Sequence, residues 1–262
     1  MKRILAIILG VLMMDMVQAE PEQFYQAKRL QHSAGTLSYR IMYPHDFNSE
    51  KRYPLVLFLH GSGERGEDNQ AQLTHGAALF ADSASRRDYP AIVIFPQAST
   101  NDDWAKVNVT RDTQPLALEF ASVNAPPTIA MQGVLALLED FSARTYVDKQ
   151  RIYVGGLSMG AMGTYEILAR RPEMFAAAIP ICGGGNPDNA AYYRKGLPLW
   201  AFHGEEDKVV APSLSVQMVE AINQHGGNAK LTLYSETGHN SWDKAFAEPE
   251  LLAWLFAQQK GA

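Results

Sequence analysis

The chain has 262 residues, of which 47% are hydrophobic and 19% are charged. Its 23 basic against 28 acidic residues leave a net charge of −5, which argues against a nucleic-acid-binding protein because phosphate contacts need clustered lysine and arginine. The single cysteine excludes an intrachain disulfide framework and a thiolate-rich metal site.

The first residues have the layout of a secretory signal peptide. Lys2 and Arg3 precede an apolar run from Ile4 to Met14, and a small-residue cleavage pattern ends at Ala19. The run is shorter than the roughly 20 apolar residues that a bilayer crossing needs. We therefore expect a signal peptide over residues 1–19, a periplasmic or secreted protein, and no stable membrane insertion after cleavage. The alternative is a buried N-terminal helix.

Beyond this segment, apolar runs of strand length alternate with longer helical patterns. Residues 54–60 form a continuous apolar run ending at glycines, as expected for a strand buried on both faces. Further strands are expected over residues 35–43, 91–95, 151–154, 176–182, 199–203 and 230–234, and helices over residues 126–141, 160–170, 212–225 and from about residue 241. This alternation predicts a single α/β domain over residues 20–262, with a mostly parallel sheet flanked by helices on both faces.

Residues 98–126 are less regular and long for a connection within one domain. We expect this segment to form a lid or one wall of a pocket. The alternative is a surface loop with a short helix.

The stretch Gly156-Leu157-Ser158-Met159-Gly160 matches the pattern G-x-S-x-G, at the end of an expected strand and the start of an expected helix. A tight turn at this point lifts the serine hydroxyl out of the sheet edge, and the glycines relieve the crowding that the turn creates. The helix also directs its positive N-terminal end toward the serine. Ser158 is therefore the candidate nucleophile.

A serine nucleophile needs a base, and the base needs an acid that orients it. In this architecture the acid and then the histidine follow the serine along the chain. Asp207, just past the strand expected over residues 199–203, is the candidate acid, and for its neighbours Glu205 and Glu206 a solvated acidic turn is the better interpretation. His239 is the candidate base because it follows the serine, the acid and the last expected strand.

The glycine-rich stretch over residues 60–66 follows the first buried strand and permits a loop whose N–H groups face inwards. An oxyanion hole needs two such donors, and the candidates are Ser62 in this loop and Met159 after the nucleophile. Arg65 is expected to take part in local salt bridges that hold the loop. The alternative is a role in binding a carboxylate of the substrate.

Four motifs together resemble the α/β-hydrolases across nearly all of residues 50–260, and more narrowly a group of bacterial secreted esterases. They are HGSGERGEDN at residues 60–69, GLSMG at 156–160, ICGGG at 181–185 and HGEED at 203–207. Members of that group are described as carboxylesterases or phospholipases, as peptidases of the prolyl-oligopeptidase type and as feruloyl-esterase-like enzymes. The resemblance implies Ser158, Asp207 and His239 as a catalytic triad. Dienelactone hydrolases are similar in outline, but they use a cysteine nucleophile.

The expected reaction is hydrolysis of a small-molecule carboxylic ester, short-chain acyl or feruloyl-type, through an acyl-enzyme. Trp104 and Trp242 are candidate substrate-binding residues, with a role as core or surface aromatics as the alternative. No metal and no cofactor are expected, because no cluster has ligand spacing and no glycine-rich loop fits a phosphate. The alternatives are a peptidase of the prolyl-oligopeptidase type, a lysophospholipase and a binding protein on a hydrolase scaffold. The oligomeric state stays open.

Overall fold

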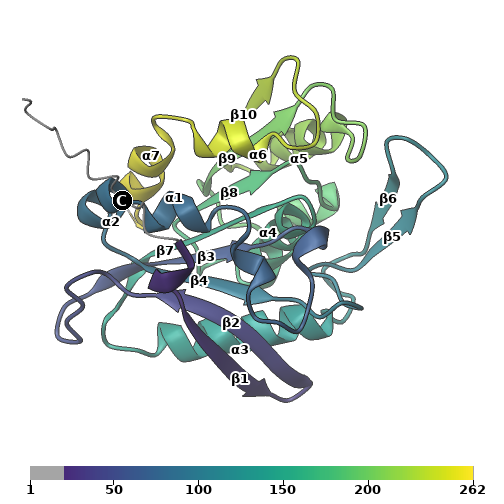
Figure 1. Cartoon of the computed structure of the whole chain (residues 1–262). Helices are drawn as coiled ribbons and strands as arrows, with labels where there is room; N and C mark the ends of the chain where they lie inside the picture. The colour runs from purple at the N-terminus through teal and green to yellow at the C-terminus, as the bar shows by residue number, and fades with distance from the viewer. Residues whose placement is uncertain (1–20, 262) are drawn as a thin grey trace, which may run out of the picture.

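The computed structural model describes residues 21–261, so the signal peptide expected over residues 1–19 lies outside the described residues. A central sheet runs in the order β1-β2-β4-β3-β7-β8-β9-β10 through this part of the chain (Figure 1). β1 and β2 are antiparallel to their neighbours and the other strands are parallel, which confirms the predicted mostly parallel sheet. The strands are β1 (Gln26–His32), β2 (Gly35–Met42), β3 (Tyr53–Leu59), β4 (Ile92–Gln97), β7 (Val147–Leu157), β8 (Ala177–Ile181), β9 (Pro198–Gly204) and β10 (Asn228–Tyr234).

Helices cover both faces of this sheet. The helices α3 (Ile129–Ser142), α4 (Met159–Arg170) and α5 (Pro212–Gln224) pack on one face. The opposite face is covered by α1 (Ala77–Ala81), α6 (Trp242–Phe246) and α7 (Leu251–Ala257), with α2 (Ser83–Asp88) beside α1. Short 3₁₀ helices cover Pro21–Phe24, Ser62–Glu64, Ala71–Leu73 and Pro187–Tyr192.

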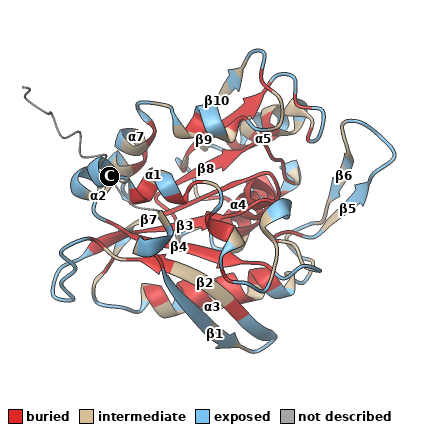
Figure 2. Cartoon of the chain, in the orientation of Figure 1, coloured by how far each residue is buried: buried red, intermediate tan, exposed pale blue. Residues whose placement is uncertain are grey.

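Strand β3 illustrates why the apolar runs in the sequence are continuous. Leu55, Leu57 and Leu59 point into the core beneath α3 and α4, whereas Val56 and Phe58 point into the core on the opposite face. Successive side chains of a strand alternate between its two faces, so a strand covered on both sides needs apolar residues throughout. Figure 2 shows this central part of the sheet as buried.

Several elements differ from the sequence-based expectation. The sequence did not predict β1, because its residues are mostly polar and contain no apolar run. In the part of the chain that the structure describes, it is an edge strand, paired only with β2 and mostly exposed. α1 and α2 have only five and six residues, too few for a helical period to be visible. The helix expected from residue 241 is two helices, α6 and α7, with Pro249 in the break between them.

Residues 98–126 contain a β-hairpin, formed by β5 (Val107–Thr110) and β6 (Ala117–Phe120). The hairpin projects from the rim of the molecule and has its own two-stranded sheet (Figure 1). Over residues 21–261, no helix has the length and apolar character that a membrane crossing requires.

The parallel part of the sheet brings distant segments together. β3, β7, β9 and β10 run in the same direction, so their carboxyl ends lie at one edge. The loops that leave these ends carry Ser62, Ser158, Asp207 and His239 respectively.

Candidate active site

Ser158 lies on a sharp turn between β7 and α4, with φ of 52° and ψ of −117°. The two glycines of the motif make this turn possible. A Cβ atom on Gly160 would lie 1.9 Å from the carbonyl oxygen of Leu59, and one on Gly156 would lie 2.5 Å from the carbonyl oxygen of Gly160. Any larger residue at either position would push the turn away from β3, so the motif reflects backbone crowding around the serine.

Three polar side chains form a continuous hydrogen-bond chain at this turn. Ser158 Oγ lies 2.9 Å from His239 Nε2, and His239 Nδ1 lies 2.7 Å from Asp207 Oδ2. A carboxylate only accepts hydrogen bonds, so Nδ1 carries the imidazole proton and Nε2 is free to accept the serine proton. The structure thus brings together the three residues that the sequence singled out.

Asp207 is buried, with 3% of its surface exposed, and it is held as an anion. Its Oδ1 accepts the N–H groups of Val209 at 2.8 Å and Val210 at 3.0 Å, and its Oδ2 also faces His203 Nε2 at 3.1 Å. Burial alone would raise the pKa of Asp207, but the hydrogen bonds from His203, His239 and the backbone outweigh it and hold the pKa well below its ordinary value. The competing acids Glu205 and Glu206 are exposed.

Ser158 and His239 open into a cleft of about 170 Å³. Ser62 and Met159 line the same cleft. Met159 is the first residue of α4, so its N–H has no partner within that helix and is available to a ligand. The remaining lining residues are Arg65, Asp103, Ala105, Val107, Val109, Arg111, Leu116, Leu118, Met162, Val209 and Val210.

The loop that carries Ser62 is braced by its first residue, His60. The N–H of Ala98 donates to His60 Nε2 at 3.0 Å, and His60 Nδ1 lies 2.6 Å from the carbonyl oxygen of Gly61. Because Nε2 accepts, the proton of this buried ring lies on Nδ1. Further along the loop, the guanidinium of Arg65 pairs with the carboxylate of Asp103 at the cleft wall. The salt bridge expected for Arg65 is therefore made to residue 103, outside the loop.

The two tryptophans do not take the places expected of them. Trp104 has no exposed surface and its indole Nε1 donates to the carbonyl oxygen of His60 at 2.9 Å, so it supports the Ser62 loop from within the core. The prediction that Trp104 contacts substrate is wrong for this reason. Trp242 packs edge-on against the His239 ring, with centroids 5.5 Å apart, and against His75. It stands behind the histidine and is not among the described residues that line the cleft.

Residues 98–126, expected to form a lid or one wall of a pocket, contribute side chains to the cleft, but the sequence singled out only Trp104 of this segment for substrate contact. Val107, Val109, Leu116 and Leu118 come from the β5–β6 hairpin, which is tied to the Asp207 loop by a hydrogen bond from the N–H of Leu116 to the carbonyl oxygen of Val209 at 3.0 Å. The available signal of a hairpin with one apolar face was the recurrence of large apolar residues at every second position, at 107 and 109 and again at 116, 118 and 120.

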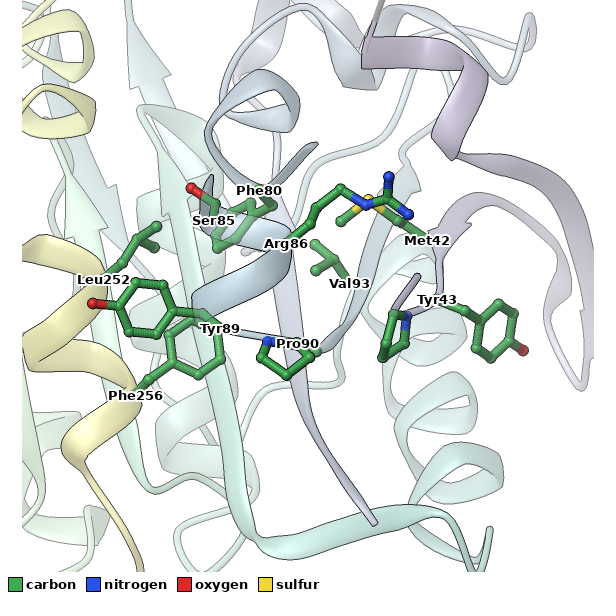
Figure 3. Close-up of a pocket in the computed structure, with 12 residues that line it drawn as sticks. Met42, Tyr43, Phe80, Ser85, Arg86, Tyr89, Pro90, Val93, Leu252 and Phe256 are labelled. Atoms are coloured by element: carbon green, nitrogen blue, oxygen red, sulfur yellow. The ribbon is translucent and has the colours of Figure 1, made fainter. Parts of the chain in front are cut away.

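A second crevice lies away from these residues, between α2, α7 and the start of β4. Its lining includes Phe80, Arg86, Tyr89, Leu252 and Phe256 (Figure 3). It holds about 10 Å³, which is close to the space of one water molecule, so it offers no room for an organic ligand.

Comparison with known proteins places this site in a family context. The model of the phospholipase/carboxylesterase family matches residues 47–249, a range that includes Ser62, Ser158, Asp207 and His239. A bifunctional acetylxylan esterase/xylanase of Neocallimastix patriciarum is 28% identical over 169 residues, which are 64% of this chain and 21% of that protein.

Solved structures show the same fold. A thermostable esterase has a TM-score of 0.80 and 32% identity, and the alignment covers 91% of this chain and 64% of that one. An acylaminoacyl peptidase of Pyrococcus horikoshii has a TM-score of 0.63 at 14% identity over 91% of this chain and 42% of its own, a likeness of fold alone. The chain thus spans about a fifth of the acetylxylan esterase/xylanase and under two thirds of the thermostable esterase.

Proposed function

The chain belongs to the phospholipase/carboxylesterase family, and on this basis we propose that it is a serine hydrolase that cleaves carboxylic esters. The observation that carries the proposal is the hydrogen-bond chain from Ser158 through His239 to Asp207, with distances of 2.9 and 2.7 Å, at a cleft open to a small molecule. A buried serine, a neutral imidazole and an ionised carboxylate in this order are the groups that acyl transfer requires.

In the proposed reaction, Ser158 Oγ attacks the ester carbonyl carbon while His239 Nε2 takes the hydroxyl proton. The oxyanion that forms accepts hydrogen bonds from the N–H groups of Ser62 and Met159. When the tetrahedral intermediate collapses, the carbon–oxygen bond to the alcohol breaks and His239 returns the proton to the leaving alkoxide. The acyl group stays on Ser158 as an ester.

Water completes the cycle in the same way. His239 takes a proton from the water that attacks the acyl-enzyme, the bond to Ser158 Oγ breaks, and the proton returns to the serine as the acid leaves. Asp207 stays ionised throughout and stabilises the imidazolium that forms in each half-reaction. The low pKa of its carboxyl group fits this role, because a weakly basic carboxylate does not take the proton from the imidazolium of His239.

The shape of the cleft supports a small acyl or single-ring aromatic ester as substrate. Its volume of about 170 Å³ is comparable with the roughly 150 Å³ apolar cavity that accommodates benzene in another protein. The hairpin contributes valine and leucine side chains to one wall, whereas Arg65 and Asp103 lie on another. An acetyl, butyryl or feruloyl-type group would therefore meet an apolar surface.

A panel of substrates with the right variants tests this proposal. The wild-type protein is expected to hydrolyse p-nitrophenyl acetate and butyrate and to react with a fluorophosphonate probe at Ser158. Ser158→Ala should lower kcat on the order of 10⁶-fold and abolish labelling. Ser213→Ala, at an exposed serine of α5, is the matched control and should behave as wild type. Ester hydrolysis that survives Ser158→Ala would refute the proposal.

The same panel separates the neighbouring activities. Methyl ferulate tests the aromatic ester, a lysophospholipid tests the phospholipase described by the family, and a dipeptide anilide tests the peptidase. We rank the peptidase lowest, because likeness to the peptidase structures is one of fold only. A protein that binds these compounds but neither turns them over nor reacts with the probe would be a binding protein on a hydrolase scaffold.

We further propose that residues 1–19 direct export and are removed after Ala19. The basic start, apolar run and small-residue cut of this segment support the proposal. Mass spectrometry of the protein isolated from a bacterial periplasm tests it, because an uncleaved chain in the cytoplasm would contradict it.

A further inference from the structure

A second histidine contacts the carboxylate of Asp207. His203 is the next-to-last residue of β9, four positions before Asp207, and its side chain has no exposed surface. Its Nε2 lies 3.1 Å from Asp207 Oδ2 and 3.0 Å from the carbonyl oxygen of Val210. On the other side of the ring, Nδ1 lies 2.8 Å from Ser215 Oγ on α5. The imidazole is therefore wedged between the Asp207 loop and a helix.

The partners of His203 determine which way its proton points. Both neighbours of Nε2, a carboxylate and a carbonyl oxygen, can only accept, so Nε2 carries a proton directed at Asp207. Ser215 Oγ lies 2.8 Å from His203 Nδ1 and 2.8 Å from the carbonyl oxygen of Gly183, and its single hydroxyl proton can be donated to either of these acceptors. These contacts anchor the opposite edge of the ring near the end of β8. Rotation of the ring would break bonds on both sides. The N–H that faces Asp207 is thus held in place by segments distant in the sequence.

Asp207 Oδ2 consequently lies between two imidazoles. His239 Nδ1 approaches it at 2.7 Å and His203 Nε2 at 3.1 Å, while Oδ1 is occupied by the two backbone N–H groups of the loop. A carboxylate oxygen that already accepts a second charge-assisted hydrogen bond stabilises a neighbouring imidazolium less than one with a single donor. The second donor also prevents the carboxylate from turning away from His239.

We propose that His203 is a positioning residue that fixes the Asp207 carboxylate toward His239 and moderates how strongly that carboxylate retains the proton on His239. The inference rests on the proposed function, because it concerns the base of that reaction. Its consequence is that activity begins at a lower pH than a lone Asp207–His239 pair would allow, since His239 must be neutral to accept the serine proton.

The groups around this pair do not offer another source of the effect. Burial raises the pKa of the Cys182 thiol and of the Tyr165 hydroxyl, so both groups stay neutral at the acidic pH values at which activity begins. Among the described residues, the other titratable or charged groups near the site are Arg111 and the Arg65–Asp103 pair on the cleft wall, His75 beside Trp242 with its partner Glu64, and the exposed Glu205, Glu206 and Lys208 of the acid loop. The variants described next leave all of these in place.

The test is the pH dependence of kcat/KM for p-nitrophenyl acetate in wild type, His203→Gln and His203→Leu. Leucine removes the donor, and the acid limb should move upward by about one pH unit. Glutamine supplies an amide N–H at the position of Nε2, and the acid limb should stay near that of wild type. Circular dichroism and thermal unfolding show whether each variant is folded. An acid limb that stays unmoved in folded His203→Leu would overturn the proposal, because a merely structural role lowers stability without changing this limb.

A third variant covers the case in which leucine is not tolerated in the core. Ser215→Ala removes the hydroxyl that anchors the far side of the ring and does not touch Asp207. It should shift the acid limb in the same direction by a smaller amount, and an unchanged limb would count against the proposal. Failure of the proposed function is separately visible, because wild type would then show no ester hydrolysis that depends on Ser158.

Discussion

Acidification from pH 7 to pH 5 should destabilise the protein through the buried imidazole of His60. The ring is 2% exposed, and its Nε2 accepts the N–H of Ala98, so a proton can bind only by breaking that bond and burying a charge. Burial lowers the pKa of His60 from 6.5 to about 4, partly opposed by the bond to Gly61 and reinforced by the charge of Arg65.

The sign and size of the effect follow from proton uptake. As the pH falls below 6.5, the unfolded chain protonates His60 whereas the folded chain does not until about pH 4, so stability is lost across this window. The free energy of unfolding should fall by about 2 kcal/mol between pH 7 and pH 5, toward a limit of about 3 kcal/mol near pH 4. Asp207 contributes below this window, because the low pKa of its carboxyl group makes its stabilisation disappear only at more acidic pH.

Urea unfolding at pH 7, 6 and 5 measures this loss. The comparison is with His60→Gln, whose side-chain oxygen can accept the N–H of Ala98 but does not titrate. Wild type should lose about 2 kcal/mol more than the variant over this range, because every other titrating group is common to both. Equal slopes of stability against pH in the two proteins would refute the reasoning. The outcome matters for the site, since His60 begins the loop that carries Ser62.

Other perturbations address the turn, the core and the cleft. Gly160→Ala should lower the free energy of unfolding by about 3 kcal/mol, because the new Cβ would lie 1.9 Å from the carbonyl oxygen of Leu59. Urea unfolding measures this change, and a change within about 0.5 kcal/mol would show that the turn relaxes freely. Trp104→Phe keeps an aromatic ring but leaves the carbonyl oxygen of His60 without its indole donor, so the free energy of unfolding should fall by about 1–2 kcal/mol. Thermal unfolding measures this loss, and an unchanged melting temperature would mean that water replaces the donor. Leu118→Ser should lower the ratio of kcat/KM for p-nitrophenyl butyrate to kcat/KM for p-nitrophenyl acetate about tenfold, because Leu118 lines the cleft. An equal reduction of kcat/KM for both esters would exclude Leu118 from the acyl-binding wall.

Much of the architecture could be predicted from the sequence because it follows from local rules. A strand covered on both faces needs an unbroken apolar run, and β3 has one in both the sequence and the structure. The G-x-S-x-G turn is equally local, since the crowding that demands its glycines arises between the turn and the adjacent strand. Asp207 and His239 were found by chain order and by their positions after strands, and parallel strands then bring such loops to one edge.

Contacts between distant segments were decided only by the tertiary structure. Trp104 follows the polar residues 101–103 in the sequence, yet it is buried in the core, where its indole donates to the carbonyl oxygen of His60, 44 residues away. Likewise, nothing in the sequence around His203 indicates that α5 turns its ring toward Asp207. Composition, periodicity and motif spacing thus determined the sheet and the candidate nucleophile, acid and base. Packing determined which aromatic rings support the site and which residues line its cleft, because burial and side-chain direction depend on what distant parts of the chain place beside them.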